Sequence, residues 1–306
     1  MIFIVEPKLG LCNQLQTIVK GILLSIKYQR DLFIHNFQIN LNTKTFTNIN
    51  EILDINEINK FLKHNNYNIK VLKYLDNSIL SKIEEFKLPN INYNKIQVLK
   101  NINIDNKNNL QNEYIYLGNI VSICLQNSLN LKYYDFKNNY YQILANLKFN
   151  NIFYEIKNKI INDLKLNNFT AIHLRIEDDA LKHFSHCHKI SIDEYNNKLK
   201  SFYELHIKNN KNNNIYISSG ILNFDNKINS QYYLDLKLKY NNIYDKSNIQ
   251  IDKYYLNNRE LIAIVDLLLC FDSSKFIGCG ISSFSRVIEG YFNYNSLIEK
   301  SNIILA

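Results

Sequence analysis

Residues 2–35 read IFIVEPKLGLCNQLQTIVKGILLSIKYQRDLFIH. The segment opens with the apolar run IFIV, which is typical of a buried strand, and Gly10 follows in a turn. From Cys12 the apolar residues recur at helical spacing up to Arg30, and a second short strand, LFIH, comes directly after. Strand, glycine turn, helix and strand in this order form a β-α-β unit of the kind found in parallel sheets. The first half of the chain is therefore predicted to be a Rossmann-like, nucleotide-fold domain.

The second half of the chain shows the same alternation. Three apolar runs are predicted to be buried parallel strands, FTAIHL (169–174), NIYISSG (214–220) and SKFIG (274–278). Helical periodicity or a helix start is found in ISIDEYNNKLKSFYELHIK (190–208), RELIAIVDLLLCF (259–271) and SSFSRVIEGYF (282–292). Between residues 40 and 150 only EYIYLG, around Tyr116, is a clear strand. We expect an α/β chain of two Rossmann-like domains, residues 1–150 and 151–306, facing each other across a ligand-binding cleft.

Composition narrows the class of protein. The chain has 306 residues, 46% of them hydrophobic and 21% charged, which are ordinary values for a globular protein of two domains. No apolar run approaches the ~20 residues that cross a bilayer, and the N-terminus lacks a signal-peptide pattern. We therefore expect no membrane span and a cytoplasmic location. The net charge of +8 is spread along the chain without a basic stripe interleaved with aromatics, so no nucleic acid partner is expected.

The cysteines and histidines are the residues that invite a disulfide or metal interpretation. The five cysteines form no close pair or repeated spacing, and we predict reduced thiols at Cys12, Cys124, Cys187, Cys270 and Cys279. His183, His186 and His188 surround Cys187, a set that could suggest zinc. Adjacent residues 187 and 188 are awkward joint ligands of one tetrahedral ion, and no second cluster completes the set. We predict no metal site.

An arginine at the end of a predicted strand is the first candidate for function. His173-Leu174-Arg175 is followed by Glu177 and Asp179. A guanidinium presents five donors in a rigid fork and keeps its charge, so at the carboxyl end of a strand it suits a pyrophosphate. The same residues also fit a surface ion-pair cluster with no function. The triplet alone leaves both interpretations open.

Two turns that precede predicted helices are the other candidates. Ser282, Ser283 and Phe284 lie between a strand and a helix, where backbone N–H groups and the helix dipole attract anions. Serine there can equally be a simple helix cap. The turn at Gly10 lacks the other glycines of a dinucleotide-binding motif, and Asn13 and the following glutamine offer neutral donors and acceptors instead.

In this order, these segments resemble the GDP-fucose protein O-fucosyltransferases, especially the plant-type O-fucosyltransferase-like branch. HLRIEDDALKHFSHC (173–187) is similar to the family's His-Leu-Arg-aromatic-Glu-x-Asp-Met block, with Ile176 for the aromatic residue and Ala180 for the methionine. Similar segments are GLCNQLQTIVKGILLSIKYQRDLFI (10–34), FTNINEILDINEI (46–58), NIYISSGI (214–221) and VDLLLCFDSSKFIGCGISSFSRVIEGY (265–291). The resemblance is collinear and covers most of the chain.

The resemblance implies a fold, a reaction and a set of site residues. The fold would be the two-domain GT-B architecture, and the reaction an inverting transfer of fucose from the sugar nucleotide GDP-fucose to a hydroxyl of a protein or glycan, without a metal or other cofactor. Arg175 would hold the β-phosphate and Asn13 would face the sugar and the acceptor. Further donor contacts would come from Gly10, His173, Asp266, Ser282, Ser283 and Phe284.

The chemistry asks for the same kinds of group. Without a metal, the charge that develops on the leaving diphosphate must be stabilised by Arg175 and the helix N-terminus after Ser282. A base must take the proton of the incoming hydroxyl, and Glu177 and Asp179 are the nearest carboxylates in sequence. The plant-type branch also includes members that resemble rhamnosyltransferases, so UDP-rhamnose is an alternative donor. A sugar-nucleotide-binding protein without catalysis is a second alternative.

Overall fold

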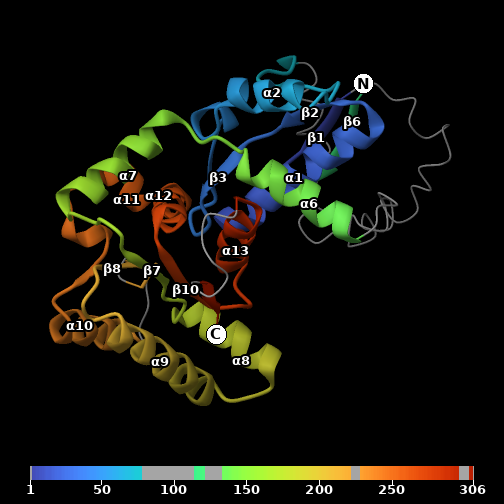
Figure 1. Cartoon of the computed structure of the whole chain (residues 1–306). Coiled ribbons are helices and arrows are strands. Elements are labelled where there is room, and N and C mark those ends of the chain that lie inside the picture. The colour runs from blue at the N-terminus through green and yellow to red at the C-terminus, as the bar shows by residue number, and fades with distance from the viewer. Residues whose placement is uncertain (1, 78–113, 121–132, 222–227, 296–302, 306) are drawn as a thin grey trace. The chain divides into compact units, whose positions relative to one another are not determined.

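The computed structural model describes residues 2–77, 114–120, 133–221, 228–295 and 303–305. Tertiary contacts divide the chain into two units, the first made of Met1–Gln38 and Lys44–Asn150, the second of Ile39–Thr43 and Asn151–Ala306. Each unit combines a parallel sheet with helices (Figure 1). The predicted α/β class is confirmed.

The sheet of the first unit contains the predicted β-α-β segment. Its parallel strands have the order β5-β2-β1-β6. Their bounds are β1 (Ile2–Val5), β2 (Asp31–Ile34), β5 (Val71–Leu72) and β6 (Tyr114–Gly118), and α1 (Leu11–Tyr28) connects the first two. Gly21 lets α1 lie close to the sheet, because a Cβ there would stand 3.0 Å from Val5 Cγ1 and 3.2 Å from Leu32 Cδ1.

The other elements in the described parts of residues 37–145 are short or weakly patterned. They are β3 (Phe37–Asn40), β4 (Thr45–Thr47), the 3-10 helix η1 (Ile49–Glu51), α2 (Ile55–His64) and α6 (Tyr133–Ala145). The expectation that EYIYLG is the one clear strand after residue 40 was incomplete, since β4 and β5 also occur there. Strands of three and two residues are too short to show an alternating pattern.

The second unit has a five-stranded parallel sheet of order β11-β10-β7-β8-β9. The strands are β7 (Thr170–His173), β8 (Ile215–Ser218), β9 (Ile243–Tyr244), β10 (Lys275–Gly278) and β11 (Ile303–Leu305). The helices in its described residues are α7 (Asn151–Asp163), α8 (Asp178–His188), α9 (Ile192–Asn209), α10 (Ser230–Lys239), α11 (Lys253–Asn257), α12 (Arg259–Asp272) and α13 (Ser283–Asn295), with the 3-10 helix η3 (Lys246–Asn248) after β9. The three strands and three helices predicted for this half are confirmed.

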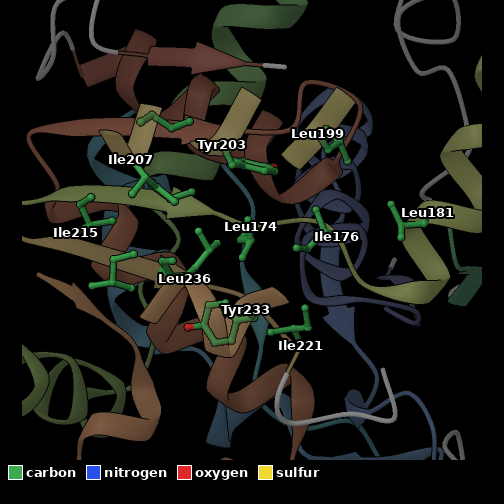
Figure 2. Close-up of a cluster of buried hydrophobic side chains, with 14 of the residues drawn as sticks. Leu174, Ile176, Leu181, Leu199, Tyr203, Ile207, Ile215, Ile221, Tyr233 and Leu236 are labelled. Atoms are coloured by element: carbon green, nitrogen blue, oxygen red, sulfur yellow. The ribbon is translucent and has the colours of Figure 1, made fainter. Parts of the chain in front are cut away.

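Helices cover both faces of this second sheet, and alternate strand residues supply the two cores. On one face Ile215 and Ile217 of β8 pack with Tyr203 of α9 and Leu236 of α10, part of the cluster that Figure 2 shows. Tyr216, between those two isoleucines, points to the other face, where its hydroxyl reaches Asp266 of α12. Because successive strand residues point to opposite faces and both faces are buried, the strand segments are continuous apolar runs in the sequence.

Among the described helices of this unit, α7, α8, α10 and α11 were not predicted from the sequence. α8 spans Asp178–His188, within the segment that the sequence marked only as a candidate site. Its buried residues are Ala180, Leu181 and Ser185, and so the apolar stripe is too narrow to give a clear helical period. Two acidic residues in its first turn and two histidines in its last turn still match the helix dipole.

Candidate active site in the C-terminal unit

The sheet order of the second unit gathers the predicted residues at one edge. Parallel strands β10, β7 and β8 are neighbours, so the segments that follow Gly278, His173 and Ser218 leave the sheet at the same edge. These segments carry the Ser282–Phe284 turn, Arg175 and the Ser219–Gly220 turn. Three stretches distant in sequence therefore form one site.

A histidine and an aromatic ring join the first two segments. The rings of His173 and Phe284 lie with their centroids 4.6 Å apart, and His173 Nδ1 lies 2.9 Å from Ser285 Oγ. Ser285 Oγ also accepts the backbone N–H of Cys279 at 3.1 Å. Burial lowers the pKa of His173 to about 3, so its imidazole is neutral near pH 7. His173 can therefore offer hydrogen bonds and ring contact, but it is not a cation for a phosphate.

Gly278 is what allows the serine hydroxyl to approach the end of β10. A Cβ at Gly278 would stand 2.4 Å from Ser285 Oγ and 2.8 Å from the ring of Phe276. Distances of this kind are not tolerated between real atoms, so any larger residue here must displace Ser285. The glycine is thus explained by close packing.

The turn after β10 leads into α13 as predicted. Ser282 donates its N–H to the carbonyl of Cys279 at 3.0 Å, and its own carbonyl accepts the N–H of Arg286 at 3.1 Å. Ser282 therefore takes the N-cap position, and α13 begins at Ser283. The first N–H groups of a helix make no bonds within the helix, and the dipole adds partial positive charge there. This helix end has the properties of an anion site.

Arg175 is held by two carboxylates that follow it in sequence, one in the same loop and one in the first turn of α8. Its NH1 lies 3.0 Å from Glu177 Oε2, and its NH1 and NH2 donate to the two oxygens of Asp179 at 3.2 and 3.0 Å. Burial alone would lower the pKa of Arg175, but these two carboxylates raise it, so its charge is permanent. The ion pairs that the non-functional interpretation predicts are present, together with a fork geometry that suits a phosphate. The backbone N–H of Arg175 donates to Tyr203 Oη at 3.3 Å, and Tyr203 donates to the carbonyl of His173 at 2.9 Å.

The two candidate bases differ in their surroundings. Glu177 is buried, and its Oε1 accepts Gly220 N–H at 2.9 Å and Ser219 Oγ–H at 3.2 Å. Burial is the largest influence and tends to raise its pKa, but the charge of Arg175 and the backbone N–H of Gly220 act together in the opposite direction, and the pKa is lowered. Asp179 is 58% exposed; partial desolvation tends to raise its pKa, but the charge and hydrogen bonds of Arg175, helped by the charge of Arg259, lower it. Carboxylates held in this way favour the charged form and are weak proton acceptors. Proton abstraction by either one stays a prediction.

Both carboxylate oxygens of Asp266 accept hydrogen bonds from buried side chains. Tyr216 Oη donates to Oδ1 at 2.7 Å, and Lys246 Nζ donates to Oδ2 at 2.8 Å. Lys246 Nζ also donates to the carbonyl of Ser219 at 2.7 Å. Sequence reasoning named Asp266 but missed its partners. One signal was available, because an aspartate in the middle of an apolar helix needs a buried donor, and Tyr216 interrupts an apolar strand.

The N-terminal candidates belong to the first unit. Gly10 is the N-cap of α1 in an extended conformation that any residue can adopt, and a Cβ there would meet nothing within 4 Å. Asn13 lies in the first turn of α1 and is half-buried. The neighbouring Gln14 is buried and donates to the carbonyls of Leu9 and Gln38, both at 2.8 Å. Gln14 thus shapes the turn, and Asn13 remains the ligand candidate of the pair.

The histidine and cysteine segment forms the exposed surface of α8. Cys187 Sγ lies 3.9 Å from His183 Nε2, one helical turn away. Within the described ranges, no group of three or more histidine, cysteine, aspartate or glutamate residues could hold a metal ion. Four cysteines are free thiols, Cys12, Cys187, Cys270 and Cys279, while Cys124 lies outside the described residues.

A half-open pocket of about 320 Å³ adjoins the turn after β10. It is lined by His188, Ile190, Tyr195, Lys198, Leu199 and Ile281. Ile281 directly precedes Ser282, and Tyr195 stacks on His188 with ring centroids 5.4 Å apart. The pocket gives the site apolar and aromatic walls beside the helix N-terminus.

A comparison with protein families shows which family the chain belongs to. The family model described as GDP-fucose protein O-fucosyltransferase matches residues 27–295. The chain belongs to this family of glycosyltransferases. No curated protein sequence matches it significantly. In the part of the chain that the structure describes, no helix has the length and apolarity needed to cross a bilayer.

Solved structures of the same fold support the architecture of this family member. POFUT1 in complex with GDP-fucose matches with a TM-score of 0.58 and 10% identity, over 99% of this chain and 97% of that chain. NodZ alpha-1,6-fucosyltransferase, soaked with GDP-fucose, matches with a TM-score of 0.55 and 11% identity, over 95% of this chain and 92% of that chain. A further similar structure is that of fucosyltransferase NodZ from Bradyrhizobium, with a TM-score of 0.52 and 10% identity. The GT-B architecture that the resemblance implied is confirmed.

Proposed function

We propose that this family member transfers fucose from GDP-fucose to a hydroxyl group of a protein or glycan, with inversion at the anomeric carbon. The arrangement of Arg175, the His173–Phe284 pair and the α13 N-terminus along one sheet edge is the observation that supports it best. It combines a permanent cation, a ring surface and a helix end suited to a diphosphate. The family membership supplies the reaction class.

The chemistry follows from these groups. The acceptor oxygen attacks the anomeric carbon as the bond to the β-phosphate oxygen breaks, and negative charge develops on the departing GDP. Arg175 and the first N–H groups of α13 stabilise this charge and require no metal for it. His173, neutral and fixed by Ser285, contacts the nucleotide by hydrogen bonding. In this proposal Asn13 faces the sugar and the acceptor. The acceptor hydroxyl must also lose its proton to a base. Glu177 or Asp179 can take this proton only if its ion pair with Arg175 is broken.

A thermal-shift panel with GDP, UDP and dTDP tests the donor. A ligand at 100 times its Kd stabilises the folded state by about 2.7 kcal/mol, and for a protein of this size each kcal/mol raises Tm by roughly 2–4 °C. We expect GDP alone to give a shift of several degrees. A shift with UDP alone would exclude GDP-fucose and support UDP-rhamnose.

Slow hydrolysis of GDP-fucose without an acceptor tests catalysis. We expect release of GDP and fucose above the rate of the buffer, because the groups that stabilise the leaving diphosphate act on water as well as on an acceptor. Binding of GDP with no hydrolysis, and with no transfer to a panel of peptide and glycan acceptors, would identify a non-catalytic sugar-nucleotide-binding protein instead.

A further inference from the structure

A buried lysine contacts the Ser219–Gly220 turn, which forms part of the candidate site. Lys246 begins η3, directly after β9, and is only 5% exposed. Its Nζ donates to Asp266 Oδ2 at 2.8 Å and to the carbonyl of Ser219 at 2.7 Å. Burying a charged side chain is costly even when it is paired, and apolar residues often replace such pairs without loss of stability. The second bond, to a backbone carbonyl, suggests a purpose other than stability.

The carbonyl that accepts from Lys246 belongs to a peptide unit whose C=O and N–H both make hydrogen bonds. The C=O of Ser219 and the N–H of Gly220 are parts of one planar group and point in opposite directions. The C=O accepts from Lys246, and the N–H donates to Glu177 Oε1 at 2.9 Å. A cation on the oxygen also polarises the peptide and strengthens the donor at its other end. Lys246 therefore fixes the orientation of the bond that Glu177 receives.

The same turn reaches the Arg175 loop by further bonds. Ser219 Oγ lies 2.9 Å from the carbonyl of Leu174 and 3.2 Å from Glu177 Oε1. Glu177 Oε2 in turn lies 3.0 Å from Arg175 NH1. A continuous path of contacts thus runs from Lys246 through one peptide unit and one carboxylate to the guanidinium.

We propose that Lys246 is a positioning residue for Arg175, acting through the Ser219–Gly220 peptide and Glu177. A charge-stabilising group works best when it is held in place before the reaction, and neighbouring groups must supply that restraint. The inference rests on the proposed function in one respect, since it assigns Arg175 to the diphosphate. The alternative role for Lys246 is to neutralise Asp266 and nothing more.

The double variant Lys246→Met/Asp266→Asn separates these two roles. It removes both charges together, keeps an acceptor for Tyr216, and leaves the Ser219 carbonyl without its cation. Neutralisation alone predicts a double variant with wild-type exchange protection at Gly220. Lys237→Met is a matched control, because Lys237 Nζ pairs with buried Asp245 at 3.2 Å in the same region and acts on a different residue.

The readouts are GDP affinity by calorimetry and amide hydrogen exchange at Gly220, both on variants shown to be folded by their melting transitions. In the double variant we expect a roughly tenfold loss of GDP affinity and of Gly220 protection, the effect of one lost bond to a charged group. Lys237→Met should keep both values. Wild-type affinity and Gly220 protection in a folded double variant would overturn the proposal.

A second variant covers the case in which the double variant does not fold. Glu177→Gln keeps an acceptor for the Gly220 N–H but removes the carboxylate charge that pairs with Arg175, so it should lose GDP affinity in the same direction, and unchanged affinity would refute the path. If wild-type protein binds no GDP, the proposed function fails. Gly220 exchange then still decides whether Lys246 orients the peptide, because that measurement needs no nucleotide.

Discussion

Replacement of Arg175 tests the proposed site most directly, provided that the effect on folding is separated from the effect on turnover. The side chain is 16% exposed and pairs with Glu177, which is 8% exposed, and with the more exposed Asp179. Removing one partner of a buried pair costs about 3–5 kcal/mol, whereas an exposed pair contributes about 0–1 kcal/mol. We therefore expect Arg175→Ala to lose about 3 kcal/mol, almost all of it through Glu177.

The companion variant Arg175→Ala/Glu177→Gln removes the uncompensated carboxylate while Gly220 and Ser219 keep an acceptor. It should regain most of the melting temperature. Its turnover of GDP-fucose should stay low by about 10²–10³, the typical loss when one preorganised donor to a developing charge is removed. Arg175→Lys keeps the charge without the fork and should fall between this variant and the wild type.

Acid titration of stability checks the same assignment. In the wild type the pKa of Glu177 lies below its ordinary value of 4.5, so its stabilisation is present above that pH and is lost as the pH falls. In Arg175→Ala the buried carboxylate lacks its cation, its pKa should rise, and stability should fall as the pH rises. The gap in stability between the two proteins should therefore widen from pH 4 to pH 7. A stable Arg175→Ala with wild-type turnover would refute the reasoning.

Four further outcomes are expected. Asp179→Asn should raise GDP affinity by calorimetry, because it releases the fork of Arg175, and a collapse of kcat with unchanged affinity would instead identify Asp179 as the base. Gly278→Ala should lower stability by about 1–3 kcal/mol in denaturant unfolding through overpacking, while the control Gly10→Ala, with open space for its Cβ, should change it by less than about 1 kcal/mol. Tyr203→Phe should cost about 1–3 kcal/mol, since it leaves a buried carbonyl and N–H without their hydroxyl partner. Transfer or hydrolysis should be complete in EDTA, and loss of activity that Mn²⁺ restores would contradict a metal-independent mechanism.

The sequence predicts the elements whose pattern is long and regular. β7, β8 and β10 are apolar runs, and α9 and α12 span 18 and 14 residues with buried positions at helical spacing. What failed has a physical reason. α8 buries only three residues, and β9 has two, so neither carries enough periodic signal to be seen without the tertiary structure.

The candidate site divides in the same way. His173, Arg175 and Phe284 could be named because strand ends and helix starts are local features, and parallel topology then brings His173 to Phe284. Lys246 and Tyr203 could not be named. Lys246 is one lysine among many in a loop, and Tyr203 sits on a helix face where a buried tyrosine reads as ordinary core. Their roles depend on hydrogen bonds to backbone atoms 27 to 30 residues away, which no local pattern encodes.

Burial separates the two carboxylates that sequence alone treats as equivalent. Glu177 is enclosed and accepts the Gly220 N–H besides pairing with Arg175, so removing it would leave that N–H without its acceptor and the guanidinium without its buried anion. Asp179 is 58% exposed and binds the fork of Arg175 from the solvent side. In the proposed function, a phosphate that approaches from solvent would compete with Asp179 for the same N–H groups, while buried Glu177 would keep its contact with the guanidinium. The site thus needs no rearrangement of its buried layer to accept an anion, because exchange of one exposed carboxylate for another charged oxygen group is sufficient.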